Sequence, residues 1–190
     1  MLYLFLGLVL WSTLHLLPAG APALRQKAVA AIGLWPYKGV FALLTLGCFV
    51  LIVQGWQATP ATALWVPPVG LRHLTLLLMI PAVIFVVAAY VPGNFIQAKL
   101  GHPMLMGVGT WGLAHLLANG EMRSVLLFGT FLIWSFMDIK AIKARDGASK
   151  PAPASNAGMR TVVVLLIGLA LYAALIIGHP HFAGRAVIAV

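Results

Sequence analysis

Apolar residues along this chain gather in six long stretches, and shorter segments rich in proline, glycine and polar residues separate them. None of the stretches contains Asp, Glu, Lys or Arg; they are Leu2–Leu17, Val40–Val53, Leu74–Tyr90, Met104–Ala118, Ser124–Phe136 and Thr161–Ile177. With their flanking aromatic residues they approach the roughly 20 residues that cross a hydrocarbon core. Backbone amides in lipid need partners within their own segment, so each stretch is predicted to be a helix. The pattern predicts an all-α fold, a polytopic transmembrane helical bundle of about six spans, with residues 1–190 as a single domain.

The composition supports this class of protein. Of the 190 residues, 62% are hydrophobic and 8% are charged, whereas about a quarter of the residues of a soluble domain are charged. A cytosolic enzyme, a disordered chain and a disulfide-stapled secreted module are therefore excluded. The single cysteine, Cys48, lies inside an apolar stretch, so there is no disulfide framework.

The net charge of +9 predicts an orientation in the membrane rather than a nucleic-acid surface. Nine basic residues follow the first, third and fifth spans: Arg25, Lys27, Lys38, Lys99, Lys140, Lys143, Arg145, Lys150 and Arg160. Three lie on the opposite side: Arg72, Arg123 and Arg185. Because basic loops stay in the cytoplasm, both termini are expected on the non-cytoplasmic side. Residues 147–156 (GASKPAPASN) are expected to form a flexible cytoplasmic linker before the last helix.

A cleaved signal peptide is an alternative interpretation of the first span. The small residues of LPAGAPA resemble a cleavage site, but no basic residue precedes Arg25. Signal peptides usually begin with a basic region, so we expect the first span to be retained.

Two histidines lie inside the apolar stretches, each in a similar short motif. WSTLHLLPAG (Trp11–Gly20) and WGLAHLLANG (Trp111–Gly120) agree at the tryptophan, the histidine, both leucines and the final glycine. Each tryptophan comes four residues before its histidine, so the two side chains share a helix face. Ionisable residues within membrane spans mark functional sites, which makes His15 and His115 the first candidates.

Two explanations of these histidines remain open. One is axial ligation of haem b, because imidazole is a common haem ligand and helical bundles hold cofactors between facing helices. Trp111, on the face of His115, and Gly112, which leaves room for a flat macrocycle, are then further candidates for cofactor contact. The other explanation is structural: each histidine bonds a carbonyl group across helices, and the glycines serve helix packing.

The pairing of the histidines is also open. His15 and His115 lie in antiparallel spans with a vertical offset of roughly 12–15 Å at the helical rise per residue. Two imidazoles on one metal span on the order of 12 Å between their α-carbons, so this pair requires a tilted ligand axis. His102, directly before Pro103, lies on the same side as His15 and forms the rival pair.

The remaining ionisable residues carry weaker signals. His73 is expected at the outer interface, and His179 and His181 are expected in an exposed tail beyond the last span. The three acidic residues, Glu121, Asp138 and Asp146, are spread along the chain. They offer no carboxylate pair for general acid–base catalysis.

Two parts of the chain carry a resemblance to a known family. They are the segment GHPMLMGVGTWGLAHLLANGEMRSVLLFGTFLIW (Gly101–Trp134) and, near the amino terminus, His15-Leu16-Leu17 followed by IGLWPYKGVFALLTL (Ile32–Leu46). These pieces resemble the NnrU-domain membrane proteins over roughly three quarters of the chain. The plant zeta-carotene isomerase is similar to the same family in these regions.

The resemblance implies a place in the cell and a chemistry. NnrU proteins are associated with bacterial denitrification and nitric-oxide metabolism, which implies the bacterial cytoplasmic (inner) membrane. The carotene isomerase carries haem b and isomerises a cis double bond without net redox change, and its implicated histidines match His15 and His115. Where that relative has a cysteine, three positions before the second histidine, this chain has Gly112. A ligand switch that uses the thiol is therefore not expected.

Two functional hypotheses follow from the residues and the resemblance together. The first is a haem-b membrane protein that isomerises an apolar polyene such as a carotene, with His15 and His115 as the expected metal ligands. The second is a non-catalytic membrane factor that supports denitrification, with the basic segment Lys140–Arg160 as its partner surface. The expected partners are membrane lipid and an apolar small molecule, and no nucleic acid.

Overall fold

The computed structural model describes residues 1–147, 149–184 and 187, and in these residues every regular element is a helix. The helices are α1 (Leu2–Gly20), α2 (Pro22–Ile32), α3 (Leu34–Ala58), α4 (Val69–Tyr90), α5 (Phe95–Leu100), α6 (Pro103–Ala118), α7 (Met122–Asp146) and α8 (Ala157–Ala183). Five of them, α1, α3, α4, α7 and α8, are long and apolar enough to cross a membrane, and α6 is a shorter apolar helix. The predicted all-α membrane bundle is confirmed, and all six predicted spans lie within helices.

Two short helices were not predicted. Helix α2 carries Arg25 and Lys27, and none of its residues is buried. Helix α5 begins after Pro92-Gly93-Asn94, where the Asn94 side chain accepts a hydrogen bond from the backbone N–H of Gln97. An asparagine that satisfies a free amide in this way is a strong helix start, and it turns the expected loop into one and a half turns of helix.

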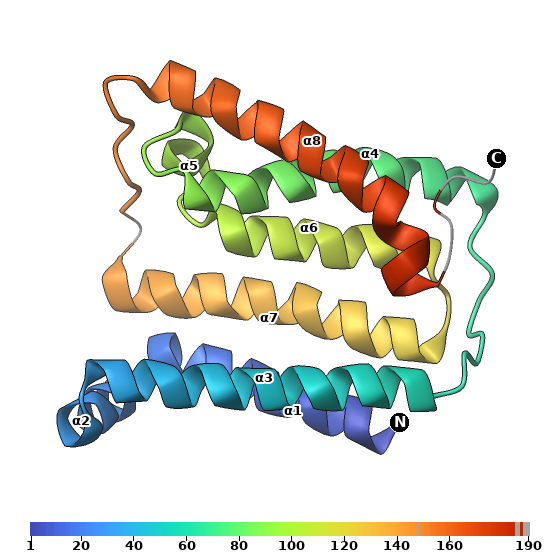
Figure 1. Cartoon of the computed structure of the whole chain (residues 1–190), viewed down its shortest axis with the longest axis horizontal. Helices are drawn as coiled ribbons and strands as arrows, with labels where there is room; N and C mark the ends of the chain where they lie inside the picture. Colours follow the sequence, from blue (N-terminus) through green and yellow to red (C-terminus); the bar gives the residue numbers. More distant parts are fainter. Residues whose placement is uncertain (148, 185–186, 188–190) are drawn as a thin grey trace.

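The six apolar helices pack in the order α3, α1, α7, α6, α4, α8, with each helix in contact with the next. Figure 1 shows α7 between the α1–α3 pair and the group formed by α4, α6 and α8. Chain neighbours are therefore often not packing neighbours. Helix α1, for example, packs against α3 and also against α7.

The connections gather at the two ends of the bundle. Helices α2 and α5 and the segment after α7 lie at one end, and the 59–68 segment and the turn between α6 and α7 lie at the other (Figure 1). At the first end, Arg145 donates a hydrogen bond to the carbonyl of Pro18 at 3.0 Å, and Lys150 donates to the carbonyl of Lys99 at 2.7 Å. The nine basic residues assigned to the cytoplasm lie in α2, in α5, at the starts of α3 and α8, at the end of α7 and at position 150, and these segments meet at this end of the bundle. Ala148 of the expected linker and Arg185 of the opposite side lie outside the described residues.

An ion pair lies at the opposite end of the bundle. Arg123 lies 3.0 Å from Glu121, and its guanidinium group also lies over the ring of Trp56, 4.7 Å from the ring centroid. The backbone N–H of Met122 donates to the carbonyl of Thr62 at 2.9 Å. These contacts fix the turn that carries the chain from α6 into α7, directly beyond His115.

Candidate functional site

The two tryptophan–histidine motifs have the same local geometry. His15 Nδ1 lies 2.9 Å from the carbonyl oxygen of Trp11, and His115 Nδ1 lies 3.0 Å from that of Trp111. A carbonyl oxygen only accepts, so in each ring Nδ1 carries the proton and Nε2 keeps its lone pair. Metal-binding histidines are commonly oriented by such a bond from the other ring nitrogen. Each motif therefore presents an imidazole in the form that binds a metal.

The rings of His15 and His115 contact different aromatic side chains. The His15 ring stacks on the Trp11 ring, with 4.1 Å between centroids and 21° between planes, and meets Phe41 of α3 edge-on at 5.2 Å. The His115 ring stacks on Phe128 of α7, with 4.5 Å between centroids. Both rings are thus held by aromatic neighbours on another helix.

Side chains of α7 lie between the two motifs. Trp11 and Trp111 both contact the ring of Phe131, at centroid distances of 4.5 and 5.6 Å. His15 lies near the α2 end of α1, and His115 lies near the opposite end of the bundle (Figure 1). Phe131 of α7 therefore joins the two motifs through aromatic contacts, and the pairing of His15 with His115 on one haem stays a prediction.

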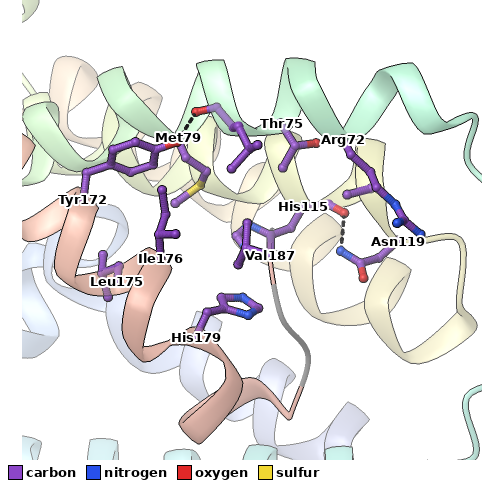
Figure 2. A pocket seen from close by; sticks show the side chains of 12 residues that line it. Arg72, Thr75, Met79, His115, Asn119, Tyr172, Leu175, Ile176, His179 and Val187 are labelled. Atoms are coloured by element: carbon purple, nitrogen blue, oxygen red, sulfur yellow. Dashed lines mark hydrogen bonds between the residues drawn. The ribbon is translucent and has the colours of Figure 1, made fainter. Parts of the chain in front are cut away.

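His115 lies in the wall of a cavity of about 210 Å³ between α4, α6 and α8 (Figure 2). Its apolar wall includes Leu76, Met79, Leu175 and Ile176, and its polar wall includes Arg72, Thr75, Asn119, Tyr172 and His179. An apolar pocket with a few converging polar groups is the usual form of a small-molecule site. The cavity is thus the best candidate for a ligand site in the described part of the chain.

Hydrogen bonds between helices hold this cavity in shape. The Tyr172 hydroxyl of α8 donates to the carbonyl of Leu76 of α4 at 2.9 Å. The Thr75 hydroxyl of α4 lies 2.8 Å from the carbonyl oxygen of Ala114 of α6. In lipid a polar side chain gains by such a bond, because no water competes for it. The three helices around the cavity are therefore tied together.

Sequence reasoning missed His179. It was expected in an exposed tail, whereas the structure extends α8 to Ala183 and places His179 in the cavity wall. The available signal was helical spacing, because Tyr172, Leu175, Ile176 and His179 follow each other at intervals that define one helix face. Pro180 obscured that signal, since a proline usually ends a helix.

The other predicted contact residues lie against α7 or at the far end. A Cβ atom on Gly112 would lie 2.8 Å from the carbonyl oxygen of Phe128, so this glycine permits close packing of α6 on α7. Trp111 packs on Phe128 and Phe131. His102 forms the N-cap of α6, at the end opposite His115. None of these three residues lies in the cavity wall.

A second polar cluster surrounds His15. Asp138 of α7 is 8% exposed and interacts electrostatically with His15 and with His102. Within the described residues, Asp138 Oδ1 and the indole nitrogens of Trp11 and Trp134 are buried and have no hydrogen-bond partner. Buried polar atoms of this kind usually bind ordered water. The rival pair His15 and His102 therefore shares a carboxylate neighbour at one end of the bundle.

The donors in the cavity wall are of the types that bind haem b, whereas the cavity volume of about 210 Å³ is below the roughly 300–1,000 Å³ of a usual small-molecule pocket. His115 offers a neutral imidazole, Arg72 offers a guanidinium group for a haem propionate, and the remaining wall is largely apolar. In the described part of the chain, no group of three or more His, Cys, Asp or Glu residues is arranged to hold a bare metal ion.

The fold and the cavity define a class: an integral membrane protein of α-helices, with a histidine-containing cavity between three of them. The family profile of NnrU protein matches residues 3–187. The chain belongs to the NnrU protein family. No curated protein and no solved structure matches it.

Proposed function

We propose that this chain is a haem-b protein of the bacterial cytoplasmic membrane and that His115 is an iron ligand. The observation that carries the proposal is the position of His115 in the cavity wall, with its Nδ1 bonded to the Trp111 carbonyl at 3.0 Å. That bond leaves Nε2 free for a metal. The resemblance to the plant carotene isomerase implies the cofactor, and the imidazole of His115 and the guanidinium group of Arg72 in the cavity wall would bind it.

The proposed chemistry is the cis–trans isomerisation of an apolar polyene such as a carotene. Bound haem would supply a redox-active iron next to the double bond. The chain itself would contribute an apolar wall (Leu76, Met79, Leu175 and Ile176) that excludes water and aligns an extended hydrocarbon. A substrate that dissolves in the bilayer reaches this wall from lipid without crossing an aqueous phase.

An absorption spectrum of the purified full-length protein tests the proposal. Protein expressed with supplemented haem is expected to show a Soret band that is lost in His115→Ala. His73→Ala is the matched control, because His73 is an exposed histidine of α4 outside the cavity wall. A wild-type protein without a Soret band would overturn haem binding. A band that survives in His115→Ala and disappears in His15→Ala or His102→Ala would place the iron ligand in the second polar cluster, around His15 and Asp138.

A second candidate function is a non-catalytic factor that supports the denitrification machinery. The basic end of the bundle favours it, because the exposed residues of α2 and the residues after Lys140 present lysines and arginines to the same aqueous face. A deletion strain distinguishes the two functions. If the His115→Ala variant restores growth on nitrite as well as the wild type does, the non-catalytic role is supported and the haem-dependent one fails.

A further inference from the structure

We propose that the elbow between α2 and α3 binds the headgroup of an anionic phospholipid. The elbow comprises residues 22–38, which form α2, the turn at Gly33 and the first turn of α3. It lies at the basic end of the bundle, whereas the cavity beside His115 lies towards the opposite end (Figure 1). A lipid bound at the elbow would therefore not touch the proposed haem site.

Helix α2 has the features of a helix that lies in the membrane surface. Its 11 residues are too few to cross a hydrocarbon core, which takes about 20. None of them is buried, and the side chains of Leu24 and Ile32 are 55% and 48% exposed. These two side chains share a face, since eight residues make little more than two turns, and Arg25 and Lys27 fall on its two edges. A short helix with an apolar face and basic flanks is typical of the membrane interface.

Aromatic rings of α3 hold two of the basic side chains of the elbow. Gly33 has a φ of +87°, a conformation that favours glycine, and it lets the chain turn sharply between α2 and α3. The Arg25 guanidinium group lies over the Tyr37 ring, 5.9 Å from its centroid, and the Lys38 ammonium group lies over the Trp35 ring at 4.8 Å. Such contacts hold a cation in place without neutralising its charge. Because Trp and Tyr favour the level of the lipid headgroups, the elbow presents its positive charge at that depth.

The acidic side chains of the chain do not neutralise the elbow. The first of the three along the sequence is Glu121, which pairs with Arg123 at the other end of the bundle. Asp138 is buried in the bundle, and Asp146 pairs with Arg145 at 2.6 Å. Within the described residues, the three cations of the elbow therefore have no acidic side chain as a counter-ion. An anionic phospholipid supplies that charge at the membrane surface, where lysines and arginines are attracted to it.

The apolar side chains of the elbow favour a lipid over a free anion. Leu24, Ile32 and Trp35 are exposed beside the cations, and Trp35 is 77% exposed. Contact with water is unfavourable for side chains of this kind. Exposed apolar side chains continue into the spanning part of α3, at Val40 and Leu43. A phospholipid covers both parts of this surface, because its phosphate pairs with the cations while its acyl chains run along the apolar side chains. An inorganic phosphate would satisfy only the charge.

Native mass spectrometry of the purified full-length protein, titrated with lipid, tests the proposal by counting the phospholipids it retains. The probes are dioleoyl phosphatidylglycerol and dioleoyl phosphatidylcholine, which share their acyl chains and differ in headgroup charge. The wild type is expected to bind phosphatidylglycerol in preference. The triple variant Arg25→Gln, Lys27→Gln, Lys38→Gln should bind it about tenfold more weakly or worse, because each cation near an anionic membrane surface contributes roughly fivefold.

A second triple variant controls for the loss of charge alone. Lys99→Gln, Lys140→Gln, Lys143→Gln removes three exposed lysines from the same end of the bundle, outside the elbow. It has the same net charge as the first variant and is expected to keep the preference for phosphatidylglycerol.

Three results would overturn the lipid site. Equal losses in the two triple variants would show that overall charge, not the elbow, attracts the lipid. Displacement of phosphatidylglycerol by millimolar inorganic phosphate would assign the cations to a free anion. A wild type that retains both lipids equally would leave the elbow to the protein partner of the second candidate function. If the first triple variant does not fold, Lys27→Gln, Lys38→Gln provides the same test, because both of these side chains are exposed.

Discussion

Trp11 and Trp111 meet at one side chain: both rings contact Phe131 of α7, at centroid distances of 4.5 and 5.6 Å. The two tryptophans begin the two similar motifs, and each carbonyl holds the histidine that follows it four residues later. Helix α7 therefore joins the two motifs through an aromatic cluster and keeps their imidazoles apart. This packing separates a site around His15 from the cavity around His115.

Replacing Phe131 with alanine tests the role of this cluster. Phe131 is buried between the two tryptophans, so Phe131→Ala should lower the free energy of unfolding by about 3–5 kcal/mol. Phe131→Leu should cost less, because it keeps most of the apolar volume. Thermal unfolding in detergent, followed by tryptophan fluorescence, measures both. A loss below about 1 kcal/mol for Phe131→Ala would contradict tight packing at this position.

Gly112 is expected to be sensitive to any side chain. A Cβ atom there would lie 2.8 Å from the Phe128 carbonyl oxygen, so Gly112→Ala must push α6 away from α7. The expected cost is about 1–3 kcal/mol. Gly129→Ala is the control, since a Cβ atom at Gly129 has no neighbour within 4 Å. That change should be neutral or stabilise by up to about 1 kcal/mol through helix propensity. Equal melting temperatures for the two variants would show that α6 and α7 do not pack this closely.

The sequence predicts the long helices because each is a run of apolar residues without charge. It does not predict α2, whose Arg25 and Lys27 interrupt the apolar pattern, or α5, whose start depends on the cap formed by Asn94. The local geometry of the His15 and His115 motifs also follows from the sequence, because a four-residue spacing fixes a helix face.

The sequence does not predict which helices are neighbours. Spans that are apolar on every side carry no preferred face, so nothing in the pattern indicated that α7 lies between α1 and α6. The pairing of His15 with His115 would place α1 and α6 on opposite sides of one cofactor, and α7 packs on both of these helices. The cavity depends on the packing of α8 against α4, which only the arrangement in space reveals.

Tyr172 is expected to stabilise the cavity through its hydroxyl group. Tyr172→Phe removes the hydrogen bond to the Leu76 carbonyl and leaves that carbonyl without its partner on α8. The expected loss of stability is about 0.5–1.5 kcal/mol, with the haem spectrum retained because the ring still fills its place. Thermal unfolding and the Soret band are measured on the same sample. An unchanged melting temperature would show that the hydroxyl group does not tie α8 to α4.

The orientation in the membrane is the last prediction, and it follows from where the basic residues gather. Helices α2 and α5 and the segment around Ser149 lie at the basic end, whereas Ala61 lies in the segment at the other end, and both Ser149 and Ala61 are exposed. Because basic loops remain in the cytoplasm, a membrane-impermeant maleimide added to intact spheroplasts should label Ala61→Cys and leave Ser149→Cys unlabelled. Both variants carry Cys48→Ala, which removes the buried native thiol. Opening the spheroplasts should make Ser149→Cys reactive, which controls for its accessibility. Labelling of Ser149→Cys in intact spheroplasts would reverse the orientation and place the cavity wall formed by Arg72 and Asn119 towards the cytoplasm.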